Sequence, residues 1–177
     1  DENMIVEKKD GTLWMLTRTF DGIGESFSND GGYTWTPGRK SHIDGPCSRF
    51  HIRRLKSGRL LMINHYQFDQ RIDLDDIMRQ GNVKSWKGRS HLTALLSEDD
   101  GKTWPYTLLL DERNEVSYPD AKEAADGYIY VTYDWERVTQ REILMARFTE
   151  EDILKGQLSS PNGKLRILVN KATGQPD

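Results

Sequence analysis

A basic segment of this 177-residue chain carries side chains that could bind a ligand or transfer a proton. In the segment SRFHIRRL at 48–55, strand alternation places Arg49, His51 and Arg53 on one face and apolar side chains on the other. Guanidinium groups beside an imidazole favour an anionic ligand, and an imidazole is suited to proton transfer. The alternative is a charged strand whose polar face is solvated and purely structural.

Two later strands end in residues that suit a sugar. His65 and Tyr66 close one strand, and Asp134 and Trp135 close the corresponding strand one repeat later. Aromatic rings at strand ends can stack on a sugar ring, and polar neighbours can bind its hydroxyl groups. With the basic strand, these residues predict a pocket for an anionic sugar.

Composition and charge exclude several classes of protein. The net charge of -3 and the isoelectric point near 5.9 argue against nucleic acid or an anionic membrane as the main partner. The mean hydropathy is -0.75, and no apolar run is long enough to cross a bilayer. The first residues, DENMIVEKKDG, lack the pattern of a signal peptide. Cys47 is the single cysteine, so we expect no internal disulfide, and its GPCSR turn suggests a small, semi-buried residue.

The elements that must position these residues are short strands separated by glycine turns. The first unit has strands at 4–8, 12–19 and 23–28, and the second has strands at 48–55, 59–66, 91–97 and 106–111. A third unit has strands at 116–124, 128–135 and 141–148. The first two strands of each unit are joined by a glycine turn, which indicates internal repeats of a four-stranded sheet.

A turn of eight residues occurs twice at equivalent places, as SNDGGYTW at 28–35 and SEDDGKTW at 97–104. Serine and aspartate side chains can bond the turn backbone, glycine permits positive φ, and tryptophan packs on the sheet. We therefore expect both turns to stabilise hairpins and not to bind ligands. The residues with these roles are Ser28, Asp30, Gly32 and Trp35 in the first turn and Ser97, Asp99, Gly101 and Trp104 in the second.

Strands such as RLLMINHY and YIYVTYDW are apolar on both faces, which predicts sheets stacked face to face. Repeats of this kind, each of about 40 to 60 residues, predict an all-β protein of the β-propeller type. We expect three blades, at 1–45, 46–112 and 113–170, and a tail at 171–177.

Two segments depart from the repeat. The segment DLDDIMRQG at 73–81 predicts a short inserted helix. In TEEDILKG at 149–156, Thr149 and Asp152 have capping-box spacing, so a helix is predicted where a third eight-residue turn would stand.

The two turns fit the pattern S-x-D-x-G-x-x-W, and the chain resembles the Asp-box, or BNR-repeat, sialidases (neuraminidases). The resemblance implies a six-bladed propeller of which this chain is the C-terminal half, roughly blades four to six. It also implies an extracellular or periplasmic location, although the chain itself shows no signal peptide.

The same resemblance implies a catalytic set. The segment VSYPDAKEAADGYIYVTYDW is similar to the segment that carries the tyrosine nucleophile of sialidases, which places Tyr118 in that role. By the same comparison, IVEKKDG places Glu7 as its partner base, and Arg89, twenty-nine residues before Tyr118, as an arginine of the carboxylate clamp. A neutral tyrosine avoids repulsion from the sialic acid carboxylate, a glutamate base activates a phenol whose ordinary pKa is about 10, and arginine binds a carboxylate bidentately.

Three departures from the family count against a working sialidase. Ile23 stands where a second arginine is usual, although Arg18 in the same blade is a possible substitute. Pro119 follows the tyrosine, where serine is more common. The first arginine and the acid/base aspartate belong to the N-terminal half, so we expect the chain to be inactive by itself.

The interpretation is thus an exo-sialidase-like glycoside hydrolase that acts on terminal sialic acid or a related anionic sugar, with no metal or organic cofactor. One alternative is a glycosidase or lyase for acidic glycans in which His51 or His65 transfers protons. Another is a propeller that binds carbohydrate without catalysis. The expected partners are a carbohydrate and, on the exposed blade faces, the missing half of the propeller or a second copy of the chain.

Overall fold

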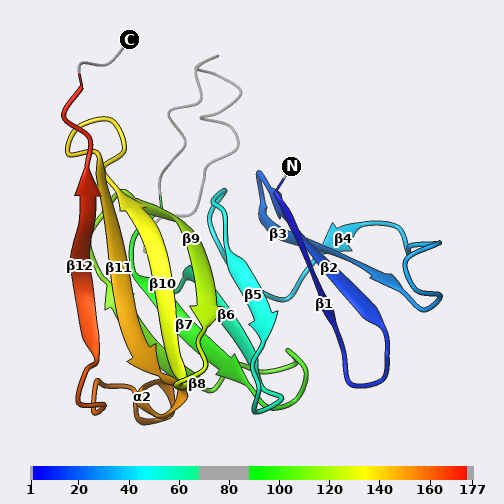
Figure 1. Ribbon diagram of the computed structural model, residues 1–177. Helices are drawn as coiled ribbons and strands as arrows, with labels where there is room; N and C mark the ends of the chain where they lie inside the picture. The colour runs from blue at the N-terminus through cyan, green and yellow to red at the C-terminus, as the bar shows by residue number, and fades with distance from the viewer. Residues whose placement is uncertain (1, 68–87, 175–177) are drawn as a thin grey trace, which may run out of the picture.

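The computed structural model describes residues 2–67 and 88–174 and folds them into three four-stranded antiparallel sheets, which lie side by side as propeller-like blades (Figure 1). Within each sheet, four strands that are consecutive in the sequence pair in order. This arrangement confirms the predicted all-β fold. The helix predicted at 73–81 lies outside the described residues.

The strands closely follow the predicted segments. The first blade contains β1 (Asn3–Glu7), β2 (Leu13–Thr19), β3 (Gly22–Ser28) and β4 (Arg39–Lys40). The second contains β5 (His51–Arg54), β6 (Leu60–His65), β7 (Leu92–Ser97) and β8 (Tyr106–Asp111). The third contains β9 (Val116–Glu123), β10 (Tyr128–Trp135), β11 (Glu142–Thr149) and β12 (Lys164–Lys171). Strand β12 thus extends one residue into the predicted tail.

The second blade lies between the other two and is covered on both faces. All six residues of β6 are buried, and so are all six of β7. Leu60 and Met62 belong to the core shared with the first blade, whereas Leu61 and Ile63 belong to the core shared with the third. Alternate residues of one strand therefore hold two neighbouring sheets, as its two-sided apolar pattern predicts.

Strand β10 does not follow that prediction, because its burial alternates. Ile129, Val131 and Tyr133 are buried against the second blade. On the other face Tyr128 and Tyr130 are half-buried and Thr132 is exposed. The apolar residues of YIYVTYDW on that face are aromatic side chains that lie across the sheet, and Arg147 covers Tyr128 with its guanidinium carbon 4.0 Å from the ring centroid.

Both repeated turns have the structural role expected of them. In the first, Asp30 accepts from the backbone N–H of Thr34 at 2.9 Å, and Ser28 Oγ accepts from Gly32 N at 2.9 Å. In the second, Asp99 accepts from Thr103 N at 2.9 Å, and Ser97 Oγ accepts from Gly101 N at 2.8 Å. The two tryptophans differ: Trp35 Nε1 donates to Gly32 O at 3.0 Å, whereas Trp104 packs against the core between the first and second blades.

The predicted capping box replaces the turn in the third blade. Helix α2 (Glu150–Lys155) begins after Thr149, whose side chain accepts from Asp152 N while the Asp152 carboxylate accepts from Thr149 N. The same carboxylate also accepts from the backbone N–H groups of Ser159 and Ser160, at 2.6 and 2.8 Å. One buried carboxylate therefore organises this corner, as Asp30 and Asp99 organise the other two.

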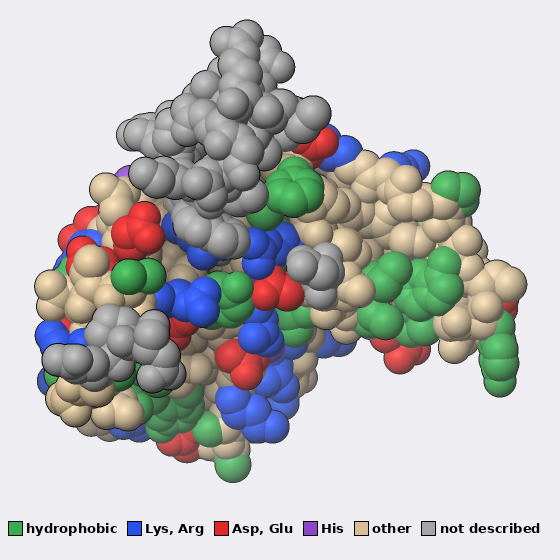
Figure 2. All heavy atoms as spheres, turned by 90° about the horizontal axis from the view of Figure 1, so that it is seen from above, with side chains coloured by type: hydrophobic (Ala, Val, Ile, Leu, Met, Phe, Trp, Pro, Cys, Tyr) green, Lys and Arg blue, Asp and Glu red, His purple; other side chains and the backbone are tan. Residues whose placement is uncertain are grey.

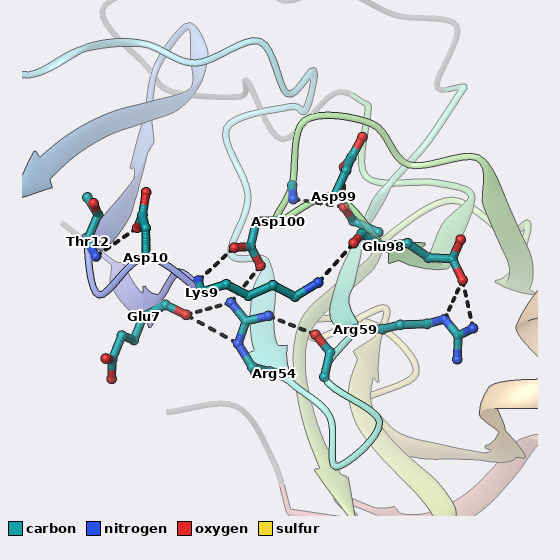
Figure 3. Close-up of polar contacts among 12 residues, drawn as sticks. Glu7, Lys9, Asp10, Thr12, Arg54, Arg59, Glu98, Asp99 and Asp100 are labelled. Carbon is teal, nitrogen blue, oxygen red and sulfur yellow. Dashed lines mark hydrogen bonds and ion pairs between the residues drawn. The ribbon is translucent and has the colours of Figure 1, made fainter.

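The second turn also joins two blades (Figure 3). Lys9, in the β1–β2 turn, donates its backbone N–H to Asp100 at 2.7 Å and its ammonium group to Glu98 O at 3.1 Å. Arg54 pairs with Asp100 at 2.8 Å and also donates to the backbone oxygen of Glu7. The carbonyl oxygen of Gly101, in the same turn, lies 2.8 Å from His42 Nε2.

The order of the strands gives the blades two distinct edges. The β1–β2, β5–β6 and β9–β10 turns share one edge with the two eight-residue turns and α2. The three hairpin turns and α2 are seen at the bottom of Figure 1. The opposite edge carries the starts of β1, β5 and β9 and the ends of β2, β6 and β10. Across residues 2–67 and 88–174, no helix has the length and hydropathy that crossing a bilayer requires.

Candidate functional site

The upper edge gathers charged side chains from all three blades. Figure 2 views the molecule from above and shows Lys and Arg side chains collected in the middle of this face, with a few Asp and Glu among them. Glu2 precedes β1, Arg18 lies near the end of β2, Arg89 precedes β7 and Tyr118 lies near the start of β9. Of the four residues in the predicted catalytic and carboxylate-binding set, three come together at this edge: Tyr118, Arg89 and Arg18.

Tyr118 is held in an unusual backbone conformation. Its φ is +55°, a value uncommon for a residue with a bulky side chain. The β9–β10 register shifts here, since Asp120 pairs with Thr132 but Ser117 pairs with Asp134, which leaves Tyr118 and Pro119 opposite a single residue. A bulge of this type redirects a side chain out of the strand's regular alternation. Strain of this kind concentrates at functional sites.

Arg18 links this tyrosine to a carboxylate. Its Nη1 lies 2.6 Å from Glu2 Oε2, and its Nε donates to the sulfur of Cys47 at 3.4 Å. Burial lowers the pKa of Arg18, but its hydrogen bonds with Glu2, Cys47 and Tyr118 outweigh that effect and raise it above its ordinary value. Arg18 therefore stays charged while it contacts both Glu2 and Tyr118.

Arg89 is the second buried cation of the cluster. Its Nη2 donates to the backbone oxygen of Cys47 at 3.0 Å, and its guanidinium carbon lies 5.8 Å from the centroid of the Tyr118 ring. Burial lowers its pKa to about 10, and the positive charges of Arg18 and Arg137 act in the same direction. A pKa of about 10 still leaves the guanidinium charged at neutral pH, so the cluster concentrates positive charge around one phenol.

Glu7 does not join the cluster, and this assignment has to be corrected. Glu7 is the last residue of β1, pairs with Leu13 beside the turn, and is exposed. Figure 3 shows its side chain pointing away from the neighbouring contacts, in which only its backbone oxygen takes part. Glu2, at the other end of the strand, is the glutamate that the structure places beside Arg18.

A signal for Glu2 was present in the sequence. A hairpin that turns at KKDGT pairs Glu7 with Leu13 and, by the same register, Asn3 with Thr17. Continuing one step outward places Glu2 opposite Arg18, where Arg18 N donates to Glu2 O at 3.1 Å. Counting the register outward from the predicted turn would have identified the pair.

The side chains of His51 and Arg53, on the basic strand β5, contact the neighbouring strand β9 rather than an open pocket. His51 Nδ1 lies 2.9 Å from Asp120 Oδ1 on β9, and Arg53 donates to Ala121 O at 3.0 Å. His51 is only 5% exposed. Burial lowers its pKa to about 4, helped by the charges of Arg53 and Arg49 and opposed by Asp120. These residues hold β5 against β9, while Arg49, just before β5, is partly exposed.

His65 and Tyr66 have different surroundings. His65 is buried and uses both ring nitrogens, with Nδ1 2.9 Å from Ser90 O and Nε2 3.1 Å from Ser48 Oγ. Burial lowers its pKa to about 4, so it is neutral at pH 7. Tyr66 is 40% exposed and lines a cavity of about 750 Å³ between the first and second blades. The residues that line this cavity do not include Tyr118, Arg18 or Arg89.

Asp134 and Trp135 lie at the upper end of β10 but do not form an open sugar platform. Trp135 packs against the core, and the guanidinium carbon of Arg113 lies 3.9 Å from the centroid of its ring. Asp134 Oδ2 lies 3.3 Å from Arg137 Nε, and burial raises the pKa of Asp134 against the effect of that arginine. Arg137 was not singled out from the sequence because it stands in a loop without a pattern.

A second cavity of about 560 Å³ lies beside the cluster. Its lining consists of Arg89, Glu115, Ser117, Glu136, Arg137, Val138 and Thr139. A volume of this size accommodates a small ligand. Over the described parts of the chain, His, Cys, Asp and Glu side chains form no group of three that would hold a metal ion.

Comparison with protein families agrees with this architecture. The model of the BNR repeat-like domain matches residues 2–131. The chain belongs to the BNR repeat-like domain family. A search of curated proteins found no match to this BNR repeat-like chain.

Two solved structures are similar to this chain at low sequence identity. A protein of unknown function from Dyadobacter fermentans DSM 18053 is 18% identical, with a TM-score of 0.52 over 82% of this chain and 46% of that one. A Hadza microbial sialidase, Hz136, is 13% identical, with a TM-score of 0.48 over 94% of this chain and 34% of that one. The BNR repeat-like chain thus spans less than half the length of either structure.

Proposed function

We propose that this chain supplies the nucleophile and part of the carboxylate site of a retaining glycoside hydrolase for terminal sialic acid or a related acidic sugar. The observation that supports the proposal most is the approach of Arg18 and Arg89 to Tyr118, with Glu2 paired to Arg18. Segments from three blades contribute to it, although the fold needs none of these groups to form its cores. The family alone does not decide the chemistry, because one fold hosts many functions.

The proposed reaction begins at the phenol. Tyr118 Oη attacks the anomeric carbon and forms a C–O bond as the glycosidic C–O bond breaks, while the phenol proton passes to the Glu2 carboxylate. The departing oxygen takes a proton from a general acid, which we assign to a part of the protein beyond these residues. Water then attacks the same carbon as the bond between that carbon and Tyr118 Oη breaks. The deprotonated general acid takes a proton from the water, and the proton held by Glu2 returns to the Tyr118 phenolate.

The arginines bind the substrate carboxylate. Arg18 and Arg89 present planar guanidinium groups that stay charged, and both contact Tyr118, so an anion held between them lies close to the nucleophile. Arg18 also forms an ion pair with Glu2, with Nη1 2.6 Å from Oε2. One side chain therefore positions both the base and the ligand.

The test is release of a fluorescent aglycone from an N-acetylneuraminic acid glycoside by the intact protein, by Tyr118→Phe, and by Tyr130→Phe as a matched tyrosine control on the same sheet. We expect Tyr118→Phe to lose turnover on the order of 10³-fold, because the covalent step is removed, and Tyr130→Phe to keep it. Undiminished turnover by Tyr118→Phe would reject the nucleophile. An intact protein that binds the sugar without cleaving it would support the carbohydrate-binding alternative instead.

A further inference from the structure

Arg137 lies in the loop between β10 and β11 and reaches back over the cluster. Its guanidinium carbon lies 4.3 Å from the centroid of the Tyr118 ring, closer than that of Arg89 at 5.8 Å. We infer that Arg137 is an additional ligand-binding residue, which contacts the carboxylate of an acidic sugar in the 560 Å³ cavity together with Arg89. The inference rests on the proposed function and adds the residue and loop that select anionic over neutral sugars.

The cavity lining supports this role. Arg89 and Arg137 both border the cavity, together with the hydroxyl-bearing residues Ser117 and Thr139. Cations and hydroxyl groups around one space can bind the carboxylate and the hydroxyls of a sugar acid. Glu136 also lines the cavity, but its carboxylate accepts a hydrogen bond from Thr139 Oγ1 within the loop.

The electrostatics point to an anion. Burial and the positive charges of Arg18 and Arg137 all act to lower the pKa of Arg89. The charges of Arg18 and Arg137 therefore disfavour the charged form of Arg89, and an anion bound beside Arg89 would offset that effect.

The fold of the loop does not depend on Arg137. Its backbone is closed by Thr139 N donating to Glu136 O at 3.1 Å, Arg141 N donating to Glu136 O at 2.7 Å, and Glu136 N donating to Glu115 O at 3.0 Å. The Arg137 side chain is 51% exposed, and its ion pair with Asp134 spans 3.3 Å. Such a pair contributes little to stability. The hydrogen bonds that close the loop therefore leave the Arg137 side chain available for a ligand beside Tyr118.

The test measures binding of free N-acetylneuraminic acid and of its uncharged methyl ester by calorimetry, so it does not depend on turnover. The proteins are the intact protein, Arg137→Gln, and Arg166→Gln, a control that removes an exposed arginine of β12 whose ion pair is with Glu112, the residue after β8. We expect Arg137→Gln to weaken binding of the acid about tenfold and of the ester less than about twofold. Arg166→Gln should change neither.

A further variant separates ligand binding from a structural role. Asp134→Asn removes the ion pair but leaves the Arg137 charge, so binding of the acid should be kept or tightened. Equal weakening of acid and ester by Arg137→Gln, or no weakening, would overturn the inference, and so would loss of acid binding in Asp134→Asn as large as in Arg137→Gln. If the intact protein binds the acid in this pattern but does not cleave the glycoside, the proposed hydrolysis fails and the role of Arg137 stands.

Discussion

The carboxylate of Glu2 lies 2.6 Å from the guanidinium group of Arg18, and the same guanidinium bonds to Tyr118. The two residues face each other because β1 and β2 pair in a continuous register, without a bulge, from the turn outward. Regular pairing of β1 with β2 thus places the Glu2 carboxylate beside Arg18, whereas Glu7 lies at the opposite end of β1.

Glu2→Gln and Glu7→Gln form a matched pair of variants that tests this relationship. If Glu2 is the base, its amide should lower turnover of the sialoside about 10²-fold or more, because a proton acceptor is lost. Glu7→Gln should stay within about twofold of the unaltered protein, since its side chain lies at the opposite edge. The reverse order of the two effects would restore Glu7 as the base.

Cys47 is expected to act as a positioning residue. Its sulfur accepts from Arg18 Nε and its backbone oxygen accepts from Arg89 Nη2, so one residue touches both arginines. Cys47→Ala should raise the KM for a sialoside by roughly fivefold and change kcat less, because only the contact with Arg18 is lost. Cys47→Ser keeps an acceptor and should recover most of the loss. Equal KM values for the alanine and serine variants would argue that the sulfur only fills space.

Gly101 is expected to be essential to the contact between the first and second blades. Its φ is +84°, and a Cβ atom there would lie 2.4 Å from the Trp14 ring. Gly101→Ala should lower the free energy of unfolding by roughly 3 kcal/mol, from backbone strain and overlap combined. Gly31 has a similar φ of +74°, but a Cβ atom there would have no neighbour within 4 Å. Gly31→Ala therefore adds backbone strain alone, and the loss of unfolding free energy should be about 1 kcal/mol. Urea unfolding measures both; similar losses would show that the ring moves aside at no cost.

Asp30 should make stability depend on pH in the acid range. Its hydrogen bonds with Thr34 and Ser28 lower its pKa to about 2 in the folded state, below the ordinary value of about 3.9 in an unfolded chain. A lowered folded-state pKa gives stability that is present above about pH 4 and is lost as pH falls toward 2. The difference in urea midpoint between the unaltered protein and Asp30→Asn should therefore shrink from pH 6 to pH 2. A difference that stays constant over that range would contradict the assignment.

The sequence predicted the strands, both eight-residue turns and the α2 capping box, because these depend on local alternation and on residues a few positions apart. The position of Tyr118 was also predicted, but its bulge was not, since a register shift depends on how β9 meets β10. His51 and Arg53 were expected at a pocket and instead pack against β9, because alternation tells which residues share a face but not which blade covers it. Arg137 was missed because its neighbours in space, Tyr118 and Arg89, come from other segments of the chain.

The division of the blades into two edges has an implication for how this family can change. The carboxylates that organise the corners, Asp30, Asp99 and Asp152, all lie at the lower edge, whereas Glu2, Arg18 and Tyr118 lie at the upper one. Substitutions in the upper loops leave the corners intact, so new ligand preferences can arise there without a large loss of stability. A mutant library confined to the 136–141 loop should accordingly contain mostly folded proteins, which makes that loop a practical starting point for engineering altered sugar selectivity.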